Sequence, residues 1–231
     1  MFSKMLTIYN DGGFFMHPIA ILLVLGFLII IERTYAIIFV YKADGAKLMQ
    51  RIQRLVLDNN IDEAVKLCNS KKRAAIYQIF KAAMVSSDRP IEEIQDHIEV
   101  ANMAVIPKLQ ERMPYLSTIA NVATLLGLLG TIIGLIQTFE AVGAVEGSQK
   151  QLLLSAGIST AMNTTAFGLI VAIPCSLAYG FLLNKINTII DEIEHYSGRL
   201  LILLRTGSQY FETDSKPIAA QKEQESKVEN E

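Results

Sequence analysis

The chain has 231 residues, of which 51% are hydrophobic and 19% are charged, and its net charge is −2. Soluble domains average about 45–50% apolar and about 25% charged residues, so the shift over the whole chain is modest. The apolar residues are concentrated, however, because 14–31, 113–139 and 151–184 contain no Asp, Glu, Lys or Arg. A helix that crosses a bilayer core needs about 20 such residues. These windows exclude an ordinary soluble enzyme, and they exclude the short alternating strands of a membrane β-barrel.

The charge and the cysteines exclude further classes of protein. A net charge near zero gives no general attraction to nucleic acid. Cys68 and Cys175 lie far apart and form no Cys-x-x-Cys motif, so neither a disulfide framework nor a zinc site is indicated.

We expect three membrane-spanning helices, over 17–39, 116–139 and 160–183. The first apolar window continues through Glu32 and Arg33 into more apolar residues, and no small-residue cleavage site closes it. It therefore resembles a span more than a signal peptide.

Lysine and arginine predict the orientation, because they are enriched in the cytoplasmic segments of membrane proteins. They are frequent in 40–112 and after 184, whereas Lys4 stands alone before the first span and Lys150 alone between the second and third spans. The N-terminus is therefore expected outside and the C-terminus inside. The remaining segments are then a periplasmic N-terminal segment (1–16), a cytoplasmic helical domain (40–115), a periplasmic loop with the start of the third helix (140–159), a cytoplasmic helix (184–211) and a disordered polar tail (212–231).

The cytoplasmic segments have apolar residues at helical spacing. We expect short helices over 47–57, 61–69 and 73–86, and then one helix of about 50 residues from Pro90 to Gly143, kinked at Pro107 and Pro114. The predicted fold class is an all-α membrane protein with three transmembrane helices and long cytoplasmic helical extensions.

Polar residues recur inside the second and third spans, where they are costly and informative. Ser117, Thr124, Thr131 and Thr138 are seven residues apart, so they share one helix face that drifts by about 20° per heptad. Small residues and further polar residues accompany them on the two spans: Gly127, Gly130, Gly134, Thr160, Ala161, Asn163, Thr164, Thr165 and Gly168. Two interpretations remain open at this point. The hydroxyls and small residues pack helices together, or they line a path for water or ions.

The deep parts of both spans lack Asp, Glu, Lys, Arg and His. A proton relay requires a titratable group at this depth, so a partner would have to supply the carboxylate. Glu32 and Arg33, near the inner end of the first span, are expected to form a charge pair at the membrane interface.

Two long motifs resemble the ExbB/TolQ proteins, the three-span branch of the MotA/TolQ/ExbB proton-channel family. They are LSTIANVATLLGLLGTIIG over 116–134, followed by Phe139, and GISTAMNTTAFGLIVAIP over 157–174. Ile31-Glu32-Arg33 is similar to the pair that closes the family's first span. The resemblance covers about residues 14–205.

The resemblance implies a pentamer in the bacterial inner membrane that surrounds two single-span ExbD/TolR-like partners, each with a membrane Asp. Ions flow down the proton motive force between pentamer and partner, and the movement of the partner energises an envelope process. The family's second-span Thr falls on Thr131 and its third-span Thr on Thr165, which places both at the ion pathway. Thr160, Asn163, Thr164 and Thr124 are further pathway candidates. Gly127, Gly130, Gly134, Ala161 and Gly168 are expected to contact the partner helix.

The chain departs from the family at two positions. The family's proline before LLGLLGT is Thr124, and its third-span glutamate is Thr160. Because hydroxyl and amide oxygens suit hard cations, Na⁺ is an alternative to H⁺ as the translocated ion.

The sequence therefore predicts an ion-channel subunit of a membrane motor, with no enzymatic chemistry, no cofactor and no bound metal. One alternative is a passive pentameric scaffold that does not conduct ions. Another is a solute carrier acting alone, which three spans without an inverted repeat disfavour.

Overall fold

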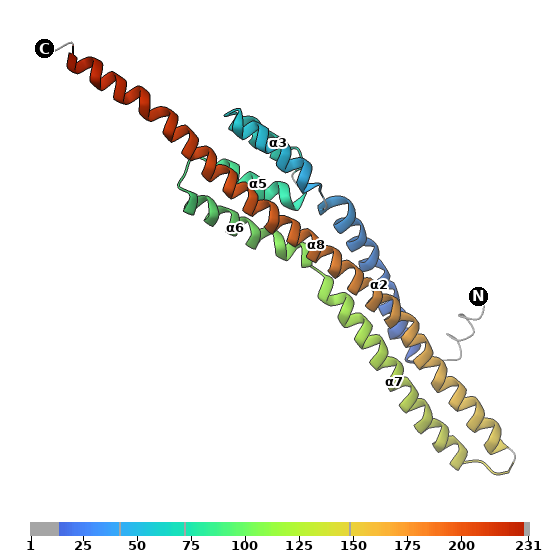
Figure 1. Cartoon of the computed structure of the whole chain (residues 1–231). Helices are drawn as coiled ribbons and strands as arrows, with labels where there is room; N and C mark the ends of the chain where they lie inside the picture. The colour runs from blue at the N-terminus through green and yellow to red at the C-terminus, as the bar shows by residue number, and fades with distance from the viewer. Residues whose placement is uncertain (1–13, 42, 72, 148, 229–231) are drawn as a thin grey trace. The chain divides into compact units, whose positions relative to one another are not determined.

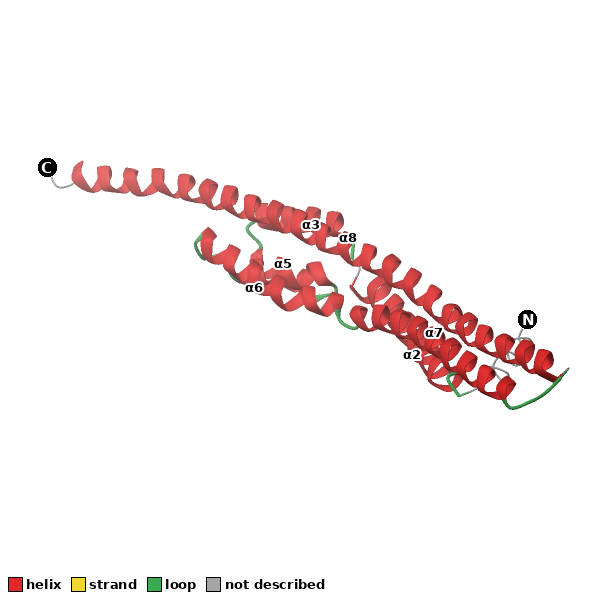
Figure 2. Cartoon of the chain, turned by 90° about the horizontal axis from the view of Figure 1, so that it is seen from below, coloured by secondary structure: helices red, strands yellow, loops and turns green. Residues whose placement is uncertain are grey.

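The computed structural model describes residues 14–41, 43–71, 73–147 and 149–228, with side chains to residue 206. The expected N-terminal segment (1–16) lies mostly outside the described residues. The described part contains helices and connecting turns and no strand, which confirms the all-α prediction (Figures 1 and 2). In chain order the helices are α2 (Met16–Tyr35), the π-helix η1 (Ala36–Tyr41), α3 (Gly45–Leu57), α4 (Ile61–Asn69), α5 (Ala75–Val85), α6 (Ile91–Gln110), α7 (Met113–Gly143) and α8 (Gln149–Val228).

Three helical stretches are long and apolar enough to cross a membrane: Met16–Leu57, Ile91–Gly143 and Gln149–Thr206. Each contains one of the expected spans. The contacts between residues divide the chain into two compact units. Unit 1 comprises the chain up to Ala36 together with 110–185, and unit 2 comprises 37–109 together with the chain from Ile186.

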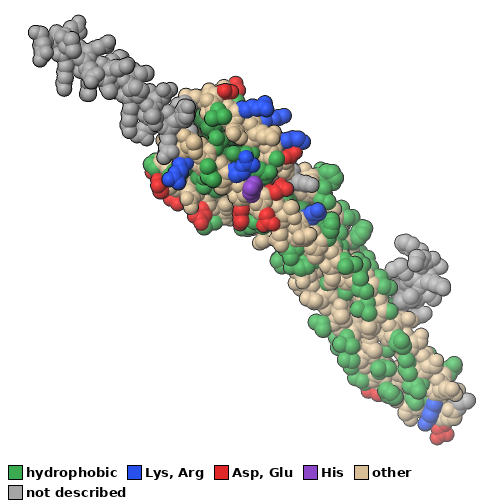
Figure 3. Space-filling view, viewed as in Figure 1, with side chains coloured by type: hydrophobic (Ala, Val, Ile, Leu, Met, Phe, Trp, Pro, Cys, Tyr) green, Lys and Arg blue, Asp and Glu red, His purple; other side chains and the backbone are tan. Residues whose placement is uncertain are grey.

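Unit 1 is a bundle of α2, α7 and the first part of α8. Gly26 on α2 faces both other helices, because a Cβ atom there would lie 2.8 Å from the Cys175 sulfur and 3.4 Å from Ile119. Large apolar side chains cover the outside of the bundle, with Leu125 63% exposed and Ile173 56% exposed. Hydrophobic side chains accordingly spread over this unit in Figure 3. A surface of this kind suits a lipid or protein environment.

Unit 2 is built from amphipathic helices. One stripe of α3, which includes Leu48, Ile52 and Val56, is buried, and α5 buries Ile79 and Phe80. Asp44 caps α3 by accepting a hydrogen bond from the Lys47 backbone N–H at 3.1 Å. Charged side chains of both signs cover this unit in Figure 3. Its core therefore forms by burial of apolar stripes from water.

The expected continuous helix from Pro90 to Gly143 is instead two helices. The chain turns at Glu111 and Arg112, and Arg112 has a left-handed backbone with φ of 63°. Pro107 stays inside α6, whereas Pro114 lies in the first turn of α7. Pro114 has no N–H to donate to the preceding turn and disfavours a helical residue before it, so α7 starts anew at this point.

The C-terminal part of α8 also differs from expectation. The helix continues to Val228, whereas the sequence predicted a disordered tail over 212–231. Glu, Lys, Gln and Ala, which are frequent there, are good helix formers. Residues 229–231 lie outside the described part of the chain.

Candidate functional site

The backbones of α7 and α8 come closest at Gly127 and Gly168. A Cβ atom on Gly127 would lie 3.2 Å from the Thr165 Cα atom, and one on Gly168 would lie 2.7 Å from the Ala123 carbonyl oxygen. Backbone atoms cannot move aside as a flexible side chain can. Glycine is therefore required for this approach, as is common where membrane helices pack through small residues.

The other predicted small residues extend the same contact. Gly130 packs against the Thr164 side chain, and a Cβ atom on Gly134 would lie 3.1 Å from that of Ala161. The five residues expected to contact a partner helix thus lie between α7 and α8 of one chain. This is the arrangement that the packing interpretation requires, and contact with a separate helix remains a prediction.

Thr131 and Thr165 meet at this closest approach. Their hydroxyls hydrogen-bond to each other, and the Thr165 hydroxyl donates to the Gly127 carbonyl at 2.9 Å. The Thr131 hydroxyl lies 3.2 Å from the Gly127 carbonyl and 3.3 Å from the Ala161 carbonyl. Both side chains are half-buried.

The pair has two proton arrangements with the same heavy-atom positions, because each hydroxyl carries one proton and can donate or accept. Thr131 can donate to Thr165, which donates to Gly127. Alternatively, Thr165 donates to Thr131, which donates to Ala161 or Gly127. The pair can therefore pass on a change in hydrogen-bond direction, or turn its lone pairs toward a cation.

The remaining predicted pathway residues do not join this pair. Thr124 is exposed and donates to the Ala120 carbonyl at 3.0 Å, and Thr164 is buried and donates to the Thr160 carbonyl at 3.2 Å. Thr160 and Asn163 are half-buried. Thr138 is buried against Gly157 and donates to the Gly134 carbonyl at 2.6 Å. Bonds to a carbonyl four residues earlier satisfy a hydroxyl within its own helix.

A charge cluster in unit 1 involves two residues that sequence reasoning missed. Arg33, which is only 3% exposed, pairs with Glu32 at 3.2 Å as expected, and also with Glu111 at 3.7 Å. Arg112 donates to Glu32 at 2.6 Å and lies 3.8 Å from Glu111. The second Glu-Arg dipeptide, just before the second span, was the signal that could have revealed this partnership. The cluster therefore contains two acidic and two basic side chains, from the end of α2 and from the turn before α7, and its net charge is close to zero.

The described residues contain no group of three or more His, Cys, Asp or Glu side chains that could hold a metal ion. Three long apolar helices packed through glycine and threonine define this chain as a multi-pass membrane protein. The sequence profile of the MotA/TolQ/ExbB proton channel family matches residues 69–195, more than half of the chain. The chain therefore belongs to this family.

Relatives with assigned names agree with this membership. The chain is 25% identical to a biopolymer transport protein ExbB homologue of Methanothermobacter thermautotrophicus, over 84% of this chain and 68% of that protein. It is 31% identical to the Tol-Pal system protein TolQ of Haemophilus influenzae, over 52% of this chain and 54% of TolQ. It is 38% identical to the biopolymer transport protein ExbB of Aquifex aeolicus, over 35% of this chain and 53% of that protein. The alignments with these last two span about half of each relative.

Proposed function

We propose that this chain is the ion-channel subunit of an inner-membrane motor. In this proposal several copies, five by the family resemblance, surround two single-span ExbD/TolR-like partners. Ion flow down the proton motive force moves the partners and energises an envelope process such as transport, envelope maintenance or gliding. The N-terminus is periplasmic and the C-terminus cytoplasmic. Family membership and the Thr131–Thr165 pair support the proposal.

The observation that carries the proposal is the position of this pair. Two hydroxyls meet between the two spans with the family motifs, and their proton arrangement can reverse. The described spans supply no deep carboxylate, so the partner's membrane Asp would accept and release the ion. One charge that crosses 100 mV yields about 2.3 kcal/mol, so work on a partner domain would accumulate over several ions.

The identity of the ion is a separate proposal. Thr160 replaces the family's glutamate, and the neighbouring Asn163 and Thr164 add oxygen atoms on the same helix. Na⁺ therefore competes with H⁺ as the translocated ion.

A passive scaffold is the second candidate function, and the hydrogen bonds support it. The hydroxyls of Thr124, Thr138 and Thr164 are each satisfied by a carbonyl of their own helix, and the small residues pack α7 against α8. A scaffold needs nothing more from these side chains. The two candidates differ in one measurable property, which is ion flux.

The test is flux in liposomes that contain the chain together with a single-span, Asp-bearing partner, under an imposed membrane potential. We expect flux that is lost when the partner's Asp becomes Asn. Thr165→Val should reduce it about thirtyfold while native mass spectrometry shows the same assembly, because it removes the hydrogen bonds to Thr131 and to the Gly127 carbonyl, each worth about 1 kcal/mol.

Thr118→Val is the matched control, because Thr118 is exposed on α7 and donates only to the Pro114 carbonyl at 3.0 Å. Its flux should equal that of the unmodified chain. Separate pH and sodium gradients then identify the ion, and sodium-independent flux that follows the pH gradient would exclude sodium coupling. An assembled complex without flux under either gradient would favour the scaffold.

A further inference from the structure

A pocket in unit 2 combines an apolar wall with two cationic side chains. The wall comes from η1, at the end of the first spanning helix, and the polar side from the turn between α4 and α5. Its volume is about 490 Å³, within the range of about 300–1,000 Å³ that is typical of ligand pockets. We call it the span-end pocket, and its lining includes Phe39, Val40, Asn69, Ser70, Lys71 and Arg73.

The two cations of the span-end pocket are available to an anion. Lys71 and Arg73 are exposed, and neither forms an ion pair with a carboxylate among the described residues. Among the residues that the structure describes, the pocket lining contains no Asp or Glu. The Ser70 hydroxyl donates to the Leu67 carbonyl at 2.7 Å, so its oxygen remains an acceptor for a ligand hydroxyl.

The covalent chain places the span-end pocket near the membrane surface. Phe39 follows Arg33 by six residues, which as helix extend about 9 Å. Apolar residues continue after Arg33 to Tyr41, and Phe39 is the last residue of the expected first span. The headgroup region extends about 5–7 Å beyond the hydrocarbon core on each side. Phe39, 71% exposed, therefore lies at about the level of the headgroups.

We propose that the span-end pocket binds the headgroup of an anionic phospholipid, such as phosphatidylglycerol, in the leaflet where the first span ends. Lys71 and Arg73 bind the phosphate, Ser70 accepts a hydrogen bond from a glycerol hydroxyl, and Phe39 and Val40 pack against the first carbons of the acyl chains. Basic pockets next to spanning helices recognise acidic lipids through these contacts. The proposal is independent of ion flux and of the partner.

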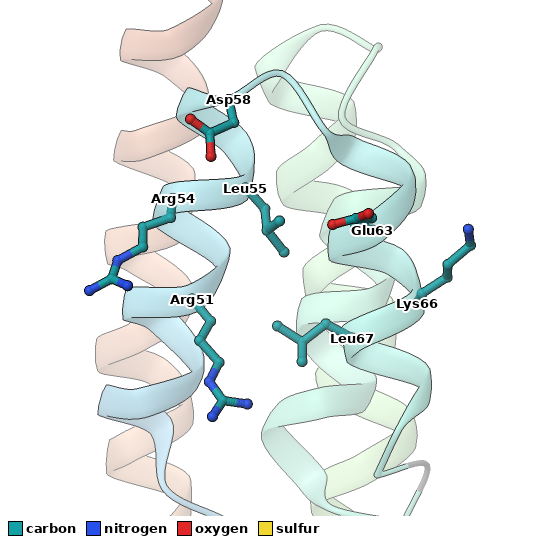
Figure 4. A pocket seen from close by; sticks show the side chains of 7 residues that line it. All are labelled: Arg51, Arg54, Leu55, Asp58, Glu63, Lys66 and Leu67. Atoms are coloured by element: carbon teal, nitrogen blue, oxygen red, sulfur yellow. The ribbon is translucent and has the colours of Figure 1, made fainter.

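A second groove in unit 2, between α3 and α4, lacks this combination (Figure 4). Arg51 points into the gap beside Leu55 and Leu67, but Asp58 and Glu63 also line it. Its mixed charges give no preference for an anion. Arg51 and Arg54 are exposed and form no ion pair among the described residues, so they serve as matched control cations.

The chain contains no tryptophan, which provides a direct test. Phe39→Trp introduces a single tryptophan at the span-end pocket, which is excited selectively over the tyrosines at the red edge of the absorption band. The full-length variant is reconstituted in vesicles of phosphatidylcholine that contain a fixed fraction of brominated phosphatidylglycerol or brominated phosphatidylcholine. We expect stronger quenching by brominated phosphatidylglycerol, with an apparent affinity about 25-fold higher, since each of the two cations near an anionic headgroup contributes about a fivefold preference.

The double variant Lys71→Gln/Arg73→Gln in the Phe39→Trp background should remove the preference, and Arg51→Gln/Arg54→Gln should retain it. Equal quenching by the two lipids would overturn the proposal, as would equal loss in both double variants. Free glycerol phosphate at millimolar concentration should not abolish the preference; if it does, the site binds soluble phosphate. If Phe39→Trp does not fold, native mass spectrometry of phosphatidylglycerol adducts on the same double variants with Phe39 retained gives the same comparison.

Discussion

The two units are stabilised by different kinds of packing. In unit 1, small residues let helices approach until backbone atoms touch, hydroxyls bond to carbonyls, and large apolar side chains face outward. In unit 2, large apolar side chains such as Phe80 are fully buried and charges face outward. The difference follows from the solvent, because removing apolar side chains from water is favourable whereas removing them from lipid is not. The same chain therefore follows opposite packing rules in its two units.

The largest expected effect is in unit 2. Phe80→Ala removes a fully buried ring and should lower the free energy of unfolding of this unit by about 3–5 kcal/mol. Leu57→Ala, at a side chain 64% exposed, should change it by less than about 0.5 kcal/mol. Chemical denaturation followed by circular dichroism measures both. Similar losses for the two variants would mean that unit 2 has no water-excluding core.

The second effect is specific to unit 1. Gly168→Ala places a methyl group 2.7 Å from the Ala123 carbonyl oxygen. This overlap should lower the free energy of unfolding by about 1–3 kcal/mol. Gly180→Ala, on the same helix with nothing within 4 Å, should be neutral or slightly stabilising. Thermal denaturation in one detergent compares them. If both variants behaved alike, the backbones would not be in contact.

A smaller effect is a pH dependence of the free energy of unfolding of unit 2. Burial raises the pKa of the Cys68 thiol to about 12. The folded state therefore retains a proton that the unfolded state loses above its pKa of about 9, so this contribution is present below pH 9 and is lost as pH rises toward 12. At pH 10 the loss should be about 1.4 kcal/mol.

Comparing unfolding at pH 8 and pH 10 for the unmodified chain and for Cys68→Ala isolates this contribution from other titrating groups. The Ala variant should lose less stability over the interval. An identical loss in both proteins would show that the thiol titrates normally.

The smallest effect tests the turn between α6 and α7. Arg112→Gln loses the ion pair with Glu32 but keeps the left-handed backbone, and should cost up to about 1 kcal/mol, because both side chains are partly exposed. Arg112→Gly loses the same pair but adopts this backbone without a steric penalty of about 1 kcal/mol. The Gly variant should therefore melt above the Gln variant. Equal melting temperatures, or a lower one for the Gly variant, would mean that the left-handed backbone at position 112 carries no steric penalty.

Sequence periodicity predicted the spans and most of unit 2, because charge-free windows and apolar stripes are local properties. It did not predict the turn at Arg112, since nothing in Glu111-Arg112 itself ends a helix. The partnership of Glu32 with Arg112 joins residues 80 positions apart, beyond the reach of any periodicity.

The hydroxyl heptad was predicted only in part. Thr131 reaches α8 and Thr138 is buried, but Thr124 on the same heptad is exposed. The helix face that carries these residues rotates by about 20° per heptad, and α8 comes closest to α7 at only one point along it. Residues that share one face on a helical wheel therefore lie in different surroundings. Thr131 and Thr165 could be paired through the family resemblance, whereas their mutual hydrogen bond depends on how closely α7 and α8 pack, which the sequence does not reveal.

The contact between Gly127 and Gly168 constrains how this protein can evolve. A Cβ atom on Gly168 would lie 3.1 Å from the Gly127 Cα atom, so an enlarged residue at one position cannot be offset by a smaller one at the other, because no residue is smaller than glycine. Second-site suppressors of Gly168→Ala should therefore be absent at position 127. They are expected where a substitution lets the helices separate, such as at Thr164 beside Gly130.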